Sequence, residues 1–281
     1  MKELALYNLK EGMVLAKDIT TPSGQVVLEK GKELTKQSIL RLSFYNIKSA
    51  CIVDGEEKQA APKSYSQKIK TSQKFQSFQV DHTIVLSQIR VSFEGYVNEG
   101  KPLDTSALLS KVVELFQSCK TSLELFNMLH NMHSSDDSVY VHSLNVSLIC
   151  RQIGKWIKAD DATLDMLTLA GLLHDIGKLK IPTELLNKPG KYTDEEFAQV
   201  RLHTQYGYEL LKPLPLDAHI KLAALSHHER CDGTGYPSGL KTNDIDPYAR
   251  VVAIADVYDA MTTARSYRAP LCAFQVIANF E

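Results

Sequence analysis

The sequence of 281 residues predicts a mainly α protein that carries a small α+β domain at its N-terminus. From about residue 67 onward, apolar side chains recur at helical spacing, and no stretch after residue 60 alternates between apolar and polar residues. Short apolar runs separated by turn residues are confined to residues 1–54. Residues 55–66 are polar and contain a proline, which is the composition of a linker.

The composition is that of an ordinary globular protein. Hydrophobic residues make up 44% and charged residues 23%, as expected for a packed core with a solvated surface. The net charge of −1 gives no general attraction to nucleic acid polymers or to anionic membranes. The five cysteines are scattered, which fits a reducing compartment better than a disulfide framework or a zinc cluster. No apolar stretch has the length of a signal-peptide core or a membrane span, so we expect a cytoplasmic protein.

In the small N-terminal domain, the predicted elements are two strands, one helix and a closing strand. Residues 13–16 and 26–28 are short apolar runs separated by the turn signal of residues 21–24. Thr35 is placed to cap the helix, and residues 50–53 are apolar enough for the last strand. Polar residues do not group here as they do in an active site, so we expect a regulatory or accessory domain.

Residues 67–135 are predicted to form a helical connecting region. A glycine and a proline within residues 100–102 interrupt the apolar periodicity and separate two helices. His130 and His133 could share a helical face, but their neighbours are polar, so we expect both at the surface.

Residues 136–281 are predicted to be the catalytic domain, because histidines and aspartates recur there on the apolar faces of consecutive helices. His174 shares a helical stripe with Leu164, Leu167 and Gly171, and Asp175 follows on the same turn. Helices are expected over residues 139–157, 161–176 and 217–227, with further ones starting at 193 and 246. Seven polar groups take inward positions on these helices: His142, His174, Asp175, His203, His227, His228 and Asp256.

This set of side chains favours a metal centre. One buried histidine is often a structural core residue, but seven such groups on one interior would be costly to desolvate without a metal. Imidazole and carboxylate ligands without thiolates suit iron, manganese, nickel or zinc better than calcium. Seven candidates exceed the needs of one ion, so two metals bridged by one carboxylate fit better. Such a pair activates a water and clamps a phosphoryl group, and Lys178, Arg265 and Arg268 near the cluster would hold phosphate oxygens.

Taken together, the motifs resemble those of the HD-GYP family of HD-domain phosphohydrolases. The matching pattern consists of His174-Asp175-Ile-Gly-Lys178, His203, His227-His228-Glu229, Gly235-Tyr236-Pro237 and Ala255-Asp256-Val-Tyr-Asp259. The resemblance implies an HD-type helical bundle that hydrolyses the bacterial messenger cyclic di-GMP at a di- or trinuclear metal centre, usually of iron. Residues 1–54 resemble, more weakly, the small domain that often precedes this one, through Gly12-Met13, Gly24, Gly31 and the closing strand.

The resemblance also implies a role for each matching residue. The metal ligands would be His142, His174, Asp175, His203, His227, His228 and Asp256, with Asp175 as the bridge. Asp175 and Lys178 would take part in catalysis, and Asp259 would hydrogen-bond to Tyr236 and shape the pocket. The substrate-binding residues would be Lys178, Gly235, Tyr236, Pro237, Asp259, Arg265 and Arg268, the last standing where lysine is common.

Two features depart from the family pattern. Trinuclear members carry a glutamate one turn before the first histidine, whereas Ser138 stands here and is a poor metal ligand. We therefore expect two divalent metals, and the linear dinucleotide pGpG as the main product. The chain also ends at Glu281 within an expected helix, whereas family members continue, so we expect a truncated C-terminus.

Two alternatives to a cyclic di-GMP phosphodiesterase stay open at this point. A degenerate module would bind cyclic di-GMP or a partner protein without turnover, and a related phosphohydrolase would act on another cyclic dinucleotide. The intact ligand set argues against the first. The resemblance favours iron over manganese or another transition metal, and the sequence leaves open whether the chain forms a homodimer or binds a signalling protein.

Overall fold

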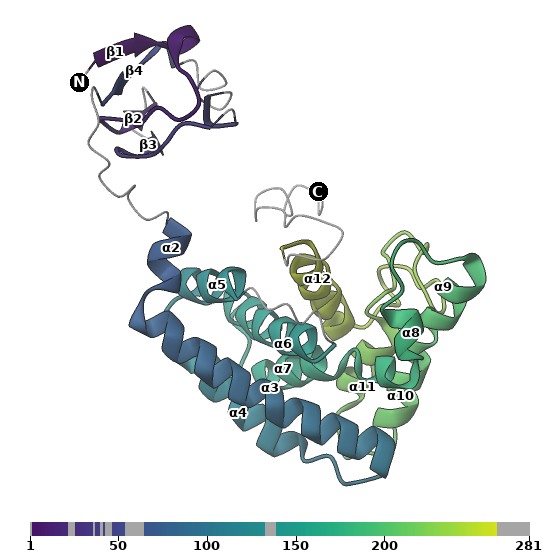
Figure 1. Ribbon diagram of the computed structural model, residues 1–281. Helices are drawn as coiled ribbons and strands as arrows, with labels where there is room; N and C mark the ends of the chain where they lie inside the picture. The colour runs from purple at the N-terminus through teal and green to yellow at the C-terminus, as the bar shows by residue number, and fades with distance from the viewer. Residues whose placement is uncertain are drawn as a thin grey trace. The chain divides into compact units, whose positions relative to one another are not determined.

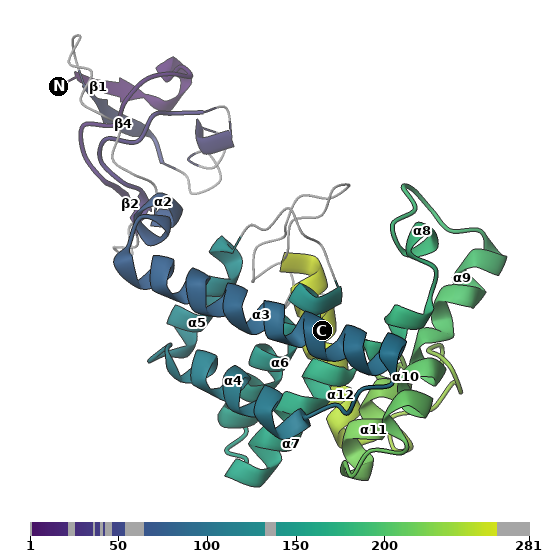
Figure 2. The ribbon, with the colours of Figure 1, turned by 60° about the horizontal axis from the view of Figure 1, so that its bottom comes forward.

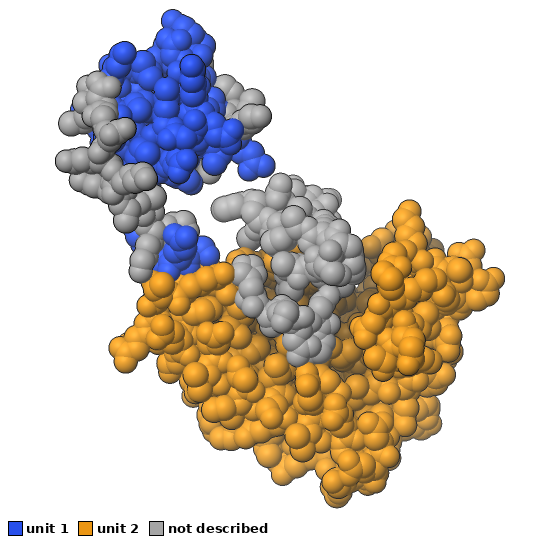
Figure 3. Space-filling model, viewed as in Figure 1, with its two compact units in different colours: residues 1–68 blue, residues 69–281 orange. Residues whose placement is uncertain are grey.

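The computed structural model describes residues 2–21, 26–35, 37–39, 42, 47–53, 65–132 and 139–262. The chain divides into two compact units, residues 1–68 and residues 69–281 (Figure 3). Among the described residues, no helix is both long and apolar enough to cross a membrane.

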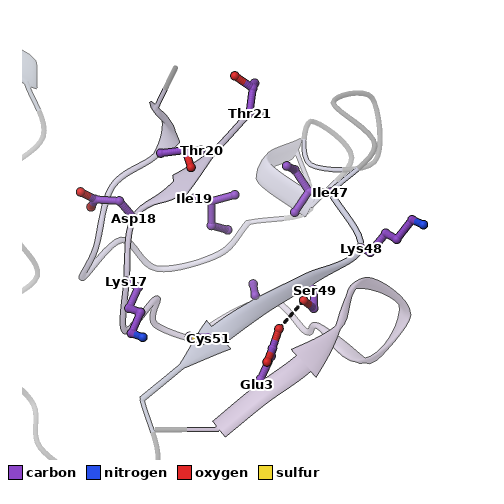
Figure 4. Close-up of a pocket in the computed structure, with 11 residues that line it drawn as sticks. Glu3, Lys17, Asp18, Ile19, Thr20, Thr21, Ile47, Lys48, Ser49 and Cys51 are labelled. Carbon is purple, nitrogen blue, oxygen red and sulfur yellow. Dashed lines mark hydrogen bonds between the residues drawn. The ribbon is translucent and has the colours of Figure 1, made fainter. Parts of the chain in front are cut away.

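The first unit is built on two small antiparallel sheets. Strand β1 (Lys2–Ala5) pairs with β4 (Ser49–Ile52), and β2 (Ile19–Thr20) pairs with β3 (Val26–Leu28). The predicted strand at residues 13–16 contributes only isolated bridges, and β1 was not predicted. Figure 4 shows a pocket of this unit between β2 and β4, where the Ser49 hydroxyl donates a hydrogen bond to Glu3.

The second unit is helical throughout its described part (Figures 1 and 2). Residues 65–132 and 139–262 contain no strand beyond one isolated bridge, between Asp232 and Lys241, so the predicted mainly α fold is confirmed. The α-helices are α2 (Tyr65–Lys70), α3 (Gln73–Glu99), α4 (Thr105–Gln117), α5 (Ser122–Asn131), α6 (Val139–Trp156), α7 (Asp161–Leu173), α8 (Thr183–Leu186), α9 (Asp194–Arg201), α10 (His203–Leu211), α11 (Ala218–Ser226) and α12 (Pro247–Thr262).

Local sequence signals account for several of the helix ends. Asp104 and Asp160 cap α4 and α7 by accepting hydrogen bonds from main-chain N–H groups three residues on. Thr193 and Glu196 form the predicted capping box at the start of α9. Gly100 ends α3 in the left-handed conformation, with φ of 68°.

Several helix bounds differ from the prediction. The helix expected over residues 161–176 ends at Leu173, and a short 3-10 helix, η2 (Ile176–Lys180), follows. The single helix expected from residue 193 is two helices, α9 and α10, which meet at Leu202. Trp156, at the end of α6, is 57% exposed and stacks on Phe126.

The core of the second unit lies around α6 and α7, which pack against each other along their length. In both views α3 and α4 lie on one side of this pair, while α10, α11 and α12 lie on the other (Figures 1 and 2). Leu144, Leu148, Leu172 and Leu173 are fully buried between these layers. Because the apolar core surrounds these leucines, the packing of the helices determines the positions of the ends of α7, α10 and α11.

The close approach of η2 to α10 requires glycine at position 177. A Cβ atom there would lie 2.0 Å from the carbonyl oxygen of His203 and 2.4 Å from the main-chain nitrogen of Gly207. Both obstacles are main-chain atoms, so a side chain at this position would push the two elements apart.

We therefore expect Gly177→Ala to lower the free energy of unfolding by roughly 1–3 kcal/mol or more, as overpacking does in dense interiors. Denaturant unfolding of the full chain measures the change. The matched control is Gly207→Ala, whose Cβ would meet nothing closer than 3.6 Å. Equal midpoints for the two variants would contradict the expectation.

Candidate metal centre

Seven side chains gather where the ends of four helices meet the middle of α12. His142 lies in the first turn of α6, His203 begins α10, and Asp256 projects from α12. The remaining four follow directly on helix ends: His174 and Asp175 after α7, and His227 and His228 after α11. The structure thus brings together all seven side chains that the sequence analysis placed in the interior.

Asp175 lies at the middle of the cluster, with its side chain 1% exposed. Its Oδ1 is 3.4 Å from Nε2 of His203 and 3.7 Å from Nε2 of His227. Its Oδ2 faces the other way, 3.3 Å from Nε2 of His174 and 3.6 Å from Nε2 of His142. Each carboxylate oxygen therefore addresses its own pair of histidines.

Four of the histidine rings are oriented through Nδ1. This atom hydrogen-bonds to the carbonyl of Gly171 in His174 (2.8 Å), of Val200 in His203 (2.7 Å) and of Ala223 in His227 (3.0 Å). In His142 it hydrogen-bonds to Oδ2 of Asp259 (2.8 Å). Because each acceptor requires a proton on Nδ1, the Nε2 atoms are left to point at the centre, as in histidines that ligate metals.

Asp256 and His228 complete the cluster on its α12 side. Oδ1 of Asp256 is 2.9 Å from Nε2 of His142, and its Oδ2 is 3.8 Å from Nδ1 of His228. The second carboxylate therefore also stands between two imidazoles.

The electrostatics of the cluster favour ionised carboxylates and neutral imidazoles. Burial opposes ionisation of Asp175, but His174 and Lys178 outweigh it and hold the pKa of the carboxyl well below its usual range. Burial lowers the pKa of His203 to about 3, and it also lowers the pKa of His228.

His142 is the exception. Burial would lower its pKa, but hydrogen bonds to Asp256 and Asp259 raise it to about 10. A cation bound at this ring would displace the Nε2 proton.

Two buried polar atoms at the centre fit a metal. Nε2 of His174 and Oδ1 of Asp175 have no hydrogen-bond partner, which is unusual for atoms cut off from water. The ligand atoms form two groups, each within 4.8 Å: Asp175 with His203, His227 and His228, and Asp175 with His142 and His174. A donor set of imidazoles and carboxylates in this arrangement suits divalent transition metals.

The Gly235-Tyr236-Pro237 loop packs against the cluster. A Cβ on Gly235 would lie 2.4 Å from the main-chain nitrogen of Arg230 and 2.5 Å from the carbonyl oxygen of His228, so the close turn requires glycine. The Tyr236 ring then lies 4.7 Å from the ring of His228. The Glu229 carboxylate holds the loop by accepting hydrogen bonds from the main-chain N–H groups of Ser238 (2.7 Å) and Leu240 (2.9 Å).

Two cations lie at this site. Lys178 donates a hydrogen bond to Oδ2 of Asp175, and its side chain is 24% exposed. The guanidinium of Arg201 lies 4.5 Å from the centre of the Tyr236 ring, next to Phe197, and has no acidic partner among the described residues. Arg201 was missed in the sequence analysis, although its place two residues before His203 was a usable signal.

Other expectations need correction. No hydrogen bond joins Asp259 to Tyr236, although both are described; Asp259 instead accepts hydrogen bonds from His142 and Asn145. His130 was expected at the surface but is half-buried, where it stacks on Tyr258 and hydrogen-bonds to its hydroxyl. Ser138, His133, Arg265 and Arg268 lie outside the described residues.

Comparison with known proteins identifies relatives of the helical part. A family model described as "HD domain" matches residues 111–279. A cyclic di-GMP phosphodiesterase of Pseudomonas aeruginosa is 39% identical over 60% of this chain and 41% of its own length. A 3′3′-cGAMP-specific phosphodiesterase of Vibrio cholerae is 37% identical over 54% of this chain and 30% of its own. A cyclic di-GMP phosphodiesterase of Thermotoga maritima is 39% identical over 53% of this chain and 40% of its own length. The chain thus spans less than half the length of these curated relatives.

A solved structure shares the fold. An HDG"Y"P protein from Bdellovibrio bacteriovorus aligns with a TM-score of 0.53 at 18% identity, over 93% of this chain and 88% of that one. Because the family model covers more than half of the chain, the protein belongs to the HD domain family, and the recognition of an HD domain in the sequence is confirmed.

The two hydrogen bonds to Glu229 should determine how firmly the loop is held. We expect Glu229→Ala to speed amide hydrogen exchange at Ser238 and Leu240 by about tenfold or more, since each amide loses a charged acceptor. Mass spectrometry of peptides covering residues 231–246 would measure this. Glu209→Ala, at an exposed site on α10, is the control. Unchanged exchange in the Glu229 variant would show that the loop is held by other contacts.

Proposed function

We propose that this protein is a metal-dependent phosphodiesterase that hydrolyses cyclic di-GMP, mainly to linear pGpG. The observation that carries the proposal is the carboxylate of Asp175, whose two oxygens face two separate pairs of histidines. Residues 136–281 would form the catalytic domain, residues 67–135 a helical connecting region, residues 55–66 a linker and residues 1–54 an accessory domain.

The proposed centre holds two divalent metals, with Asp175 as the shared ligand. His203, His227 and His228 would complete one site, and His142, His174 and Asp256 the other. Iron is our first choice of metal, with manganese or another transition metal as the alternative. When bound, such a pair supplies an activated water and withdraws charge from the phosphoryl oxygens.

The chain's own residues would bind and orient the substrate around these ions. Lys178 is part-exposed beside Asp175, so its ammonium can reach a phosphate oxygen or the leaving oxygen. Tyr236, with Gly235 and Pro237, forms the wall next to His228, and Arg201 adds a guanidinium suited to phosphate. Arg265 and Arg268 are proposed as further phosphate-binding residues. Asp259 would act by orienting His142 rather than through Tyr236.

A second candidate substrate is 3′3′-cGAMP. Three relatives from Vibrio cholerae, 35–37% identical to this chain, carry the name of 3′3′-cGAMP-specific phosphodiesterases. Both substrates present the same phosphodiester to the metals, so the bases must decide between them. A module that binds without turnover is less well supported, because none of the seven proposed ligands is replaced.

The bridging role of Asp175 predicts that metal and activity are lost together. We expect Asp175→Ala, purified without oxygen, to lose both ions and the hydrolysis of cyclic di-GMP, because neither site keeps its shared ligand. Elemental analysis and a turnover assay provide the two readouts. Glu114→Ala serves as the control, since Glu114 is exposed on α4 and pairs there with Lys111. Full metal content with normal turnover in the Asp175 variant would contradict the proposal.

Product identity tests the metal count and the substrate together. With Ser138 in place of a third-site carboxylate, we expect two metals, accumulation of pGpG from cyclic di-GMP and slow formation of GMP. Chromatography of time courses with cyclic di-GMP and with 3′3′-cGAMP, side by side, would measure both points. GMP appearing without a pGpG lag would refute the two-metal expectation, and faster cleavage of 3′3′-cGAMP would favour the second substrate. Ser138→Glu should raise the metal content if the rest of a third site is present.

A further inference from the structure

A chain of hydrogen bonds runs from helix α3 to His142. Nε2 of His82 on α3 is 3.4 Å from Oδ1 of Asn145 on α6. The amide nitrogen of Asn145 donates to Oδ1 of Asp259 on α12 at 3.0 Å. Oδ2 of the same carboxylate accepts from Nδ1 of His142 at 2.8 Å. His82 is 2% exposed, and Asn145 and Asp259 are each 5% exposed, so these hydrogen bonds are shielded from water.

The carboxylate of Asp259 sets the donor-to-acceptor direction of all three hydrogen bonds. A carboxylate only accepts, so the Asn145 amide must turn its nitrogen toward Asp259 and its oxygen toward His82. That oxygen in turn needs a donor, which fixes the proton of the His82 ring on Nε2. Burial lowers the pKa of His82, so the ring is neutral and has a single N–H to donate. All donors thus point toward Asp259, and His142 keeps Nε2 for the centre.

We propose that His82 and Asn145 are positioning residues of the metal centre, which hold Asp259 and through it the ring of His142. His82 lies before residue 111, where the match to the HD domain model begins, so part of this support comes from outside the matched region. The assignment rests on the proposed function, because it gives His142 the role of a metal ligand. Partners that orient a ligating histidine are a recurrent part of metal sites.

The tautomer of His82 tests the direction of its hydrogen bond to Asn145 in the unaltered protein. Long-range proton–nitrogen NMR spectra of the full chain with labelled histidine should show the His82 proton on Nε2. The His82→Gln variant, which has no imidazole, identifies the signal. A proton on Nδ1 would mean that His82 does not donate to Asn145 and would overturn the proposal, whether or not the protein binds metal.

Metal affinity tests the consequence without reference to activity. We expect His82→Leu and Asn145→Leu to weaken Zn²⁺ binding, measured by competition with a chromophoric chelator, by about tenfold, the lower end of the effect seen for outer partners of ligands. Of two Zn²⁺ ions, only the one bound by His142 should be affected, so one of the two binding steps should weaken. The visible spectrum of the Co²⁺-loaded protein should change in the same variants, because the ring of His142 is no longer held.

Two further variants separate positioning from general destabilisation. His82→Gln can offer an amide N–H near the position of Nε2 and should restore most of the affinity. Ile89→Ala opens a cavity at another fully buried position of α3 and should lower the melting temperature with unchanged Zn²⁺ affinity. If His82→Leu does not fold, the Zn²⁺ affinities of the wild type, His82→Gln and Asn145→Leu still decide whether the positioning role holds.

The outcomes distinguish this proposal from the proposed function. If the wild-type chain binds neither Zn²⁺ nor Co²⁺, the proposed metal centre fails. If the wild type binds them and the Leu variants bind equally well, or if Ile89→Ala loses as much affinity as His82→Leu, the positioning role fails and the metal centre stands.

Discussion

The buried carboxylate of Asp175 is the constraint on which the helical unit depends. An ionised carboxyl group without water is costly unless charges and hydrogen-bond donors surround it. Here Lys178 donates to one carboxylate oxygen, while histidines on α6, α7, α10 and α11 turn Nε2 atoms toward both oxygens, as they would toward a cation shared with the carboxylate. The ends of four helices must therefore converge on one side chain. That arrangement leaves one of its oxygens without a hydrogen-bond partner. A polar atom left unsatisfied at a fully buried position is expected where function, rather than stability, selects the residues.

The packing around Asp175 depends on three main-chain positions that have no room for a side chain. Gly171 lets α7 approach α6 beside Cys150, Gly177 lets η2 touch α10, and Gly235 brings the Tyr236 loop onto His228. Each close approach brings a ligand, or a residue next to one, into place. The apolar core between α6 and α7 then fixes the distances, because a dense interior transmits small shifts instead of absorbing them.

The inward position of His142, His174 and His203 could be predicted from the sequence because each shares a helical stripe with leucines or valines, a pattern that is local. The mainly helical fold followed from the same periodicity. Contacts made by tertiary packing could not be predicted in this way: Asn145 and Asp259 are 114 residues apart, and His82 and Asn145 are 63 apart. The break at Leu202 and the end of α7 before His174 also lack a proline or glycine signal at the break itself. Strand β1 was missed because four residues paired in a two-stranded sheet leave little apolar pattern to detect.

The ways in which the histidines are held divide the centre into two unequal halves. His174, His203 and His227 hydrogen-bond to main-chain carbonyls three or four residues earlier in the sequence, so the local backbone orients their rings. The ring of His142 is held by Asp259, a side chain from another helix, and Asp259 depends on Asn145 in turn. The first group is therefore preorganised as soon as α7, α10 and α11 form. The half that contains His142 and Asp256 is complete only when α12 packs against α6. Of two ions bound here, the one at His142 should depend more strongly on tertiary packing, because two of its proposed ligands, His142 and Asp256, are placed by contacts between helices.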